Sequence, residues 1–127
     1  MKHILLIDND PMFITTVSSI LKSENFQVSI AKDGKEAAGE LSSKQFDLII
    51  TDMLIPYTNG LELVNNIRQN TETRHTPVMV VSGIANEHSI ASWFRVGANA
   101  YLQKPLNVSA LLTGIKQLIV NVRNVAA

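Results

Sequence analysis

Residues 48–52 read Leu-Ile-Ile-Thr-Asp, a run of aliphatic and β-branched side chains that ends on a carboxylate. The run does not alternate between polar and apolar residues, which is typical of a parallel strand covered on both faces. Similar runs recur along the chain, and the segments between them have the spacing of amphipathic helices. The predicted strands are Ile4–Ile7, Val28–Ala31, Leu48–Thr51, Val78–Val81 and Ala100–Leu102.

Helix-start signals follow the first two predicted strands. Asp10 precedes Pro11, the pattern of a capped helix start, and Asp33 precedes Glu36 by three residues, the pattern of a capping box. Strands that alternate with helices predict an α/β fold with right-handed crossovers and a parallel sheet. Five strands are too few for an eight-stranded barrel, so we expect a five-stranded doubly wound parallel sheet.

The composition bounds the class of protein. The chain has 127 residues, and we expect residues 1–127 to form a single domain. Hydrophobic residues make up 46% and charged residues 17%, which excludes a disordered chain. The 11 basic and 11 acidic residues balance, so a direct nucleic-acid partner is not expected. No apolar run approaches the roughly 20 residues of a membrane span, and there is no cysteine, so we expect a cytoplasmic protein without membrane contact.

Polar residues follow four of the predicted strands, at the end where ligands of an open α/β sheet bind. Converging carboxylates repel one another unless a cation offsets them, and a cluster of oxygen ligands selects a hard cation such as Mg²⁺. A metal cluster, a carboxylate nucleophile, a hydroxyl and a lysine together favour chemistry on a phosphoryl group. The candidate residues, in chain order, are Asp8, Asn9, Asp10, Asp52, Ser82, Gly83 and Lys104.

These residues resemble the signature of response-regulator receiver domains, the phosphoacceptor domains of two-component phosphorelay signal transduction, and in particular the chemotaxis-regulator type. The resemblance covers essentially the whole chain, and the spacing from Asp52 to Ser82 to Lys104 is that of the family. It implies a flavodoxin-like (βα)5 fold with strand order 2-1-3-4-5, and a Lys-Pro bond that is typically cis. The other matching residues are Pro56, Gly60, Gly97-Ala98 and Tyr101-Leu102-Gln103-Lys104-Pro105.

The resemblance implies a phosphoacceptor and a metal site. Asp52 would take a phosphoryl group from a sensor histidine kinase or a histidine phosphotransfer domain and become an aspartyl phosphate. Mg²⁺ would be held by Asp52 together with Asp8, Asn9 or Asp10, and the Leu54 carbonyl. The domain would catalyse only its own phosphorylation and dephosphorylation, so no separate enzymatic activity is expected.

The resemblance also implies a phosphoryl-binding set and a switch. Lys104 and the backbone of Met53 and Gly83 would bind phosphoryl oxygens. Ser82 would move toward the phosphoryl group and Tyr101 would fill the vacated space. The surface of the fourth helix, fifth strand and fifth helix would then change for a downstream output protein or domain.

Some residues depart from the family's pattern. Asn9 replaces the second of two adjacent acids, so we predict weaker Mg²⁺ binding than at a two-acid site; Asp10 either compensates or only caps the helix. Gly83 replaces the commoner alanine and keeps its N–H. Asn99 replaces an acid that one transcription-factor subgroup uses in pairing, so that dimer is not expected.

Two further segments bear on phosphoryl lifetime and on contacts. Leu54 and Ile84 correspond to positions that flank the phosphoryl group, and both are apolar, so we predict slow self-dephosphorylation. Residues 57–60 read Tyr-Thr-Asn-Gly, which predicts a loop and turn before the third helix.

Two alternative interpretations remain open. Asp8, Ser82 and Lys104 also resemble the motifs of haloacid-dehalogenase-type phosphatases, in which Asp8 would be the nucleophile. That family needs a later acidic pair, and no acid follows Glu87. The other interpretation, suggested by Asn9, is a pseudo-receiver, an interaction module that works independently of phosphorylation.

Overall fold

The strands and helices alternate along the chain in the predicted order. The structure, a computed structural model, describes residues 1–83 and 86–126, with side chains through residue 119. The strands of the main sheet are β1 (His3–Ile7), β2 (Gln27–Ala31), β3 (Leu48–Thr51), β6 (Val78–Ser82) and β7 (Ala100–Gln103). The helices are α1 (Pro11–Ser23), α2 (Gly34–Ser43), α3 (Gly60–Gln69), α4 (Glu87–Val96) and α5 (Val108–Ala126).

The main sheet is parallel throughout and has the order β2-β1-β3-β6-β7. Counted over these five strands alone, this is the order 2-1-3-4-5, so the predicted doubly wound fold is confirmed. The register aligns the strand ends, because Ile7 pairs with Thr51 and Ser82 pairs with Gln103. The polar residues that follow these strands therefore leave the sheet at one edge.

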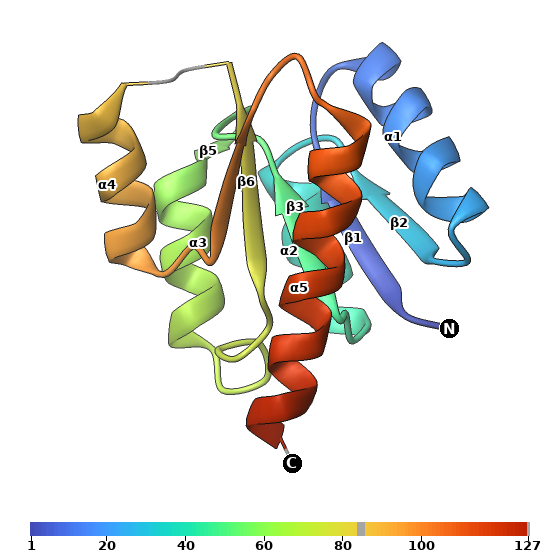
Figure 1. The fold of residues 1–127 in the computed structure, drawn as a ribbon. Helices are drawn as coiled ribbons and strands as arrows, with labels where there is room; N and C mark the ends of the chain where they lie inside the picture. Colours follow the sequence, from blue (N-terminus) through green and yellow to red (C-terminus); the bar gives the residue numbers. More distant parts are fainter. Residues whose placement is uncertain (84–85, 127) are drawn as a thin grey trace.

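Helices cover both faces of the sheet. Ile4 and Leu6 of β1 lie in a core cluster with residues of α1 and α5, such as Val17 and Leu111. Leu5 and Ile7 of β1 point to the opposite face and lie in a second cluster, with residues of α2 and α3. Figure 1 shows α5 and α1 on one side of the sheet and α3 and α4 on the other. Each fully buried aliphatic side chain of this kind stabilises the fold by about 1.5–3 kcal/mol.

A third, smaller cluster lies beneath α4, next to the end of β3. It contains Met53, Val80, Trp93 and Ala98, and Tyr101 of β7 packs against it. Met53 directly follows Asp52 in the chain. The cluster therefore joins the predicted phosphoacceptor strand end to the helix and strand of the predicted switch surface.

The predicted loop at residues 57–60 includes a feature that the sequence interpretation missed. β4 (Leu54–Ile55) and β5 (Thr58–Asn59) pair as a two-stranded antiparallel ribbon. Tyr57, in the turn between them, has a φ of 71°, the left-handed region that glycine usually occupies. Each strand has only two residues, which is too short for a periodic pattern to reveal it.

Each helix begins at a side-chain cap, and the two starts predicted at Asp10 and Asp33 are confirmed. The side chains of Asp10, Asp33, Asn59, Asn86 and Asn107 each accept a backbone N–H from the first turn of the following helix. Such caps satisfy N–H groups that have no partner inside the helix. Within the described residues, no helix combines the length and the apolar character needed to cross a bilayer.

Candidate functional site

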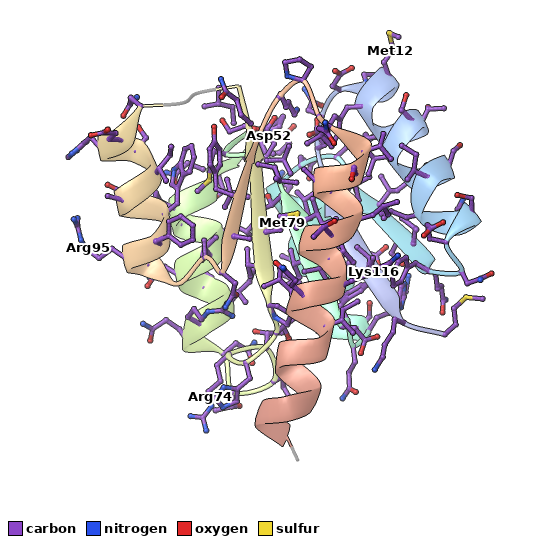
Figure 2. All side chains as sticks on the ribbon, viewed as in Figure 1. Met12, Asp52, Arg74, Met79, Arg95 and Lys116 are labelled. Atoms are coloured by element: carbon purple, nitrogen blue, oxygen red, sulfur yellow. The ribbon has the colours of Figure 1, made fainter. Side chains whose placement is uncertain are left out.

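Three predicted site residues meet at the carboxyl edge of the sheet. The Lys104 ammonium donates to Asp8 Oδ2 at 2.9 Å and to Asp52 Oδ2 at 3.0 Å. Asp8 follows β1, Asp52 follows β3 and Lys104 follows β7. Figure 2 shows Asp52 at the upper end of the sheet, among the loops that leave the strands. Residues distant in sequence thus form one cluster of two carboxylates and one cation.

Backbone hydrogen bonds hold the two acids in place. The Asp8 N–H donates to the Ala31 carbonyl at 3.1 Å, and the Asp52 N–H donates to the Ile7 carbonyl at 3.0 Å. Asp8 Oδ1 also accepts the N–H of Asp10 at 2.9 Å. The side chain of Asp8 is only 2% exposed, whereas that of Asp52 is 16% exposed. Of the two carboxylates, Asp52 is therefore the more open to a reagent from solvent.

Lys104 balances the two carboxylates electrostatically. Partial burial by itself lowers the pKa of Lys104, but the hydrogen bonds and charges of Asp8 and Asp52 outweigh it and raise that pKa above its ordinary value. The group is therefore an ammonium at neutral pH. Its backbone N–H donates to the Ser82 carbonyl at 2.9 Å, which fixes the start of the Lys104 side chain beside β6.

The β1–α1 loop supplies two more polar side chains. Asn9 and Asp10 are both exposed. Asp10 Oδ1 accepts the N–H of Met12 at 3.1 Å, so Asp10 caps α1, one of the two roles considered for it from the sequence. In residues 1–83 and 86–119, no three His, Cys, Asp or Glu side chains are grouped so as to hold a metal. The carboxylate ligands of a metal at this edge of the sheet would therefore be Asp8 and Asp52.

The donor set still suits a hard cation. Asp8 and Asp52 both direct a carboxylate oxygen at the same positive charge, the Lys104 ammonium, so the cluster already accommodates a cation between two oxygens. Mg²⁺ commonly takes one or two carboxylates and keeps several waters. The Asn9 side chain, on the β1–α1 loop, and the Leu54 carbonyl, at the start of β4, are further oxygen donors close in sequence to the two acids.

The predicted phosphoryl-binding and switch residues lie around this cluster. Ser82 is fully buried at the end of β6, and Gly83 is exposed with open space around it. Met53 is buried, whereas Leu54 is 67% exposed. Ile84, predicted to flank the phosphoryl group, lies outside the described residues. The Lys104-Pro105 bond is cis, as expected.

Tyr101 packs against Trp93. Their ring centroids are 5.2 Å apart, and Tyr101 is half-buried while Trp93 is buried. Trp93 belongs to the third core cluster and is a packing residue of α4. Its next neighbour, Phe94, is 45% exposed on α4. The predicted switch tyrosine is thus in direct contact with the helix whose surface it would alter.

The sequence interpretation missed one residue of the site. Phe13 of α1 packs on the core, and the Lys104 ammonium lies 4.2 Å from the centroid of its ring. The spacing within α1 predicts which face is apolar. It gives no indication that the ring also contacts a cation 91 positions further along the chain.

Comparisons with known proteins agree with this geometry. Residues 4–116 match the family described as the response regulator receiver domain. Response regulator ArlR of Staphylococcus epidermidis is 30% identical over 119 residues, which are 94% of this chain and 53% of that protein. The CheY-like receiver domain protein of Methanospirillum hungatei JF-1 has a TM-score of 0.91 at 27% identity, with 98% of both chains covered.

A further solved structure shares the fold. The receiver domain of the sensor histidine kinase PA1611 from Pseudomonas aeruginosa, which holds a magnesium ion in its active site cleft, has a TM-score of 0.86 at 24% identity. The alignment covers 93% of this chain and 97% of that one. The chain spans about half the length of these curated relatives, such as ArlR and the transcriptional regulatory protein CpxR of Escherichia coli. The sequence match, the parallel sheet and the clustered strand ends together show that this chain belongs to the response regulator receiver domain family of two-component systems.

Proposed function

We propose that Asp52 is the phosphoacceptor of a two-component phosphorelay, in a domain that acts in the cytoplasm. The single observation that carries this proposal is the position of Asp52 Oδ2, 3.0 Å from the Lys104 ammonium and at the open edge of the sheet. The donor is the phosphohistidine of a sensor histidine kinase or a histidine phosphotransfer domain. No other described carboxylate combines this ion pair with comparable access from solvent, because Asp8 is buried.

The reaction is a displacement at phosphorus. A carboxylate oxygen of Asp52 attacks the phosphorus atom and forms a P–O bond. The P–N bond to the donor imidazole breaks, and its electron pair stays on the nitrogen. The product is an acyl phosphate on Asp52, and the domain supplies the nucleophile and the electrostatic stabilisation rather than the activated group.

Lys104 would provide the positive charge at the reacting group. Its ammonium is held between Asp8 and Asp52 before the reaction, so it needs only a small movement to meet a phosphoryl oxygen on Asp52. Charge-assisted hydrogen bonds of this kind are among the strong ones in proteins. Ser82 and the backbone N–H groups of Met53 and Gly83 would bind the remaining phosphoryl oxygens.

Asp8, Asp52 and the Leu54 carbonyl would hold Mg²⁺, together with Asn9 or Asp10. When bound, Mg²⁺ neutralises the negative charge that develops on the transferred group. The two carboxylates that already share a cation support this assignment. The magnesium in the active site cleft of the Pseudomonas receiver domain, which has the same fold, is consistent with it.

Phosphorylation would change the surface on the side of the third core cluster that faces away from Asp52. Ser82 would move toward the phosphoryl group, and Tyr101 would follow it inward and change its packing on Trp93. The surface of α4, β7 and α5 would then favour a different partner, an output protein or domain. A near-complete shift between two states requires about 5 kcal/mol of differential interaction.

Incubation with acetyl phosphate and Mg²⁺, followed by intact-mass measurement, tests this function. The unmodified sequence should gain one phosphoryl group, and the gain should disappear with Asp52→Asn or with a chelator. Asp47→Asn, at an acid that precedes β3 at its other end, is the matched control and should keep the adduct. Absence of an adduct would instead support the pseudo-receiver. Turnover of a phosphate ester that survives Asp52→Ala and is lost with Asp8→Asn would support the phosphatase.

A further inference from the structure

Phe13 occupies one side of the Lys104 ammonium. The ammonium lies 4.2 Å from the centroid of the Phe13 ring and also donates to Asp8 and Asp52 at 2.9 and 3.0 Å. An ammonium has three N–H donors, and two of them are directed at the carboxylates. The aromatic ring therefore lies on a side of the nitrogen that neither carboxylate occupies.

The ring is well placed to hold its position. Phe13 lies in the first turn of α1, which begins at Pro11 and is capped by Asp10. The ring is half-buried and packs on the core cluster that α1 and α5 form with the sheet. The loop that carries Asp8 thus leads directly into the helix turn that carries Phe13. Asp8 and Phe13, which both contact the ammonium, therefore belong to one capped segment of the chain.

A groove between α1 and the start of α5 leaves the Lys104 side chain open to solvent at this point. The groove has a volume of about 490 Å³, and Phe13, Lys104, Pro105 and Leu106 are among the residues that line it. Without an aromatic ring, this side of the ammonium would be hydrated, and the long Lys104 side chain would be free to turn into the groove. Ordering such a side chain costs conformational entropy.

The face of an aromatic ring attracts a cation without accepting a full ion pair. The ring can therefore hold Lys104 beside Asp52. When a phosphoryl oxygen arrives, the ring competes with it for the ammonium less strongly than a third carboxylate would. Correct placement of a charged group before the reaction lowers the barrier of the step.

We propose that Phe13 is a positioning residue for phosphoryl transfer, acting through its ring on Lys104. The inference rests on the proposed function, because it concerns the rate at which Asp52 is phosphorylated. Phe13 itself contacts neither the phosphoryl group nor Mg²⁺ in this scheme. Its role is specific to an aromatic side chain, so a leucine that fills similar apolar space should not replace it.

The test compares Phe13→Leu with Phe13→Tyr. The measured quantity is the initial rate of Asp52 phosphorylation by acetyl phosphate at saturating Mg²⁺, over a range of acetyl phosphate concentrations. Phe13→Leu should lower this rate by about three- to tenfold, the range that a partly exposed cation–π contact corresponds to. Phe13→Tyr keeps an aromatic face and should recover most of the rate. Unfolding in urea checks that both variants are folded at the assay temperature.

A double-mutant cycle separates positioning from a general structural effect. In a Lys104→Met background, Phe13→Leu should change the already slow rate by less than about a factor of two, because the ring has no ammonium left to hold. Equal losses in both backgrounds, or a Phe13→Leu rate equal to that of the unmodified sequence, would overturn the inference while leaving Asp52 as the phosphoacceptor. If the unmodified sequence gains no phosphoryl group at all, the proposed function fails and the inference fails with it.

Discussion

Asp52 and Lys104 are 52 residues apart in the chain, yet the Lys104 ammonium lies 3.0 Å from Asp52 Oδ2. The parallel sheet brings them together, because β3 and β7 both flank β6 and end at the same edge. Asp8 joins the pair from β1, on the other side of β3. The proposed chemistry depends on this relationship between the three strand ends.

Gly60→Ala should destabilise the fold. A Cβ at this position would lie 2.8 Å from Met53 Cα and would overlap the Met53 sulfur, and the Gly60 N–H already donates to the Met53 carbonyl at 3.0 Å. Relieving that overlap requires movement of the segment after Asp52, so we expect a loss of about 1–3 kcal/mol in the free energy of unfolding. Urea denaturation measures it. Gly39→Ala is the control and should stabilise by about 0.5–1 kcal/mol, because a Cβ added at this helical position would meet no atom within 4 Å outside its own helix backbone.

Asn9→Asp should strengthen Mg²⁺ binding. The change adds a carboxylate to the exposed loop beside Asp8 and Asp52, and the affinity of a hard-cation site rises with the charge of its ligands. We expect the dissociation constant for Mg²⁺ to fall by about tenfold in a calorimetric titration. Asn65→Asp, at an exposed position on α3, makes the same change in net charge and should leave the affinity unaltered. Equal effects of the two substitutions would show that Asn9 is not near the metal.

Arg68→Lys should weaken the hydrogen bonds that connect α3 to the turn before β7. The Arg68 guanidinium donates to the carbonyls of Gly97 at 2.8 Å and Thr76 at 2.7 Å, and to Asn99 Oδ1 at 2.7 Å. Burial lowers the pKa of Arg68, but a guanidinium stays charged. A lysine lacks the planar fork that reaches these acceptors, so we expect a loss of about 2 kcal/mol in urea denaturation.

The control for this prediction is Arg74→Lys. Arg74 is exposed, and its side chain points away from the body of the domain in Figure 2. The substitution should change the free energy of unfolding by less than about 0.5 kcal/mol. A similar loss in both variants would contradict the structural role given to Arg68.

His3→Gln should reduce the loss of stability in mild acid. Burial lowers the pKa of His3, and Lys44 lowers it further, while Glu40 and Asp47 raise it by less. The folded state therefore disfavours the imidazolium. The stability linked to neutral His3 is fully present above pH 6.5, the ordinary pKa. It declines as the pH falls from 6.5 through the lowered pKa of His3 in the folded state. In urea denaturation between about pH 7 and 5, the free energy of unfolding should decline less steeply for His3→Gln than for the unmodified sequence. The exposed control His75→Gln should decline as steeply as the unmodified sequence.

The local features of this fold could be predicted from the sequence. The strand Leu48–Thr51 has a continuous aliphatic pattern, and Asp10 and Asp33 are cap residues at the starts of predicted helices. Such signals depend on neighbouring residues, so they are visible in a short window. The candidate site followed from them, because parallel strands place the residues after their carboxyl ends at one edge.

Contacts that depend on tertiary packing could not be predicted. The ring of Phe13 over Lys104 and the hydrogen bonds from Arg68 to Gly97 join segments that no local pattern relates. The ribbon of β4 and β5 was missed because its strands have two residues each. The geometry of Asp10 as a helix cap was one of two options in the sequence, and only the structure shows its contact with Met12.

The most direct test of the central claim is to identify the residue that is modified. After incubation with acetyl phosphate and Mg²⁺, borohydride reduces an aspartyl phosphate to homoserine, which peptide mass spectrometry locates in the chain. The account predicts homoserine at position 52 and nowhere else. Homoserine at position 8 or 10, or a phosphoryl adduct that survives in Asp52→Asn, would contradict it.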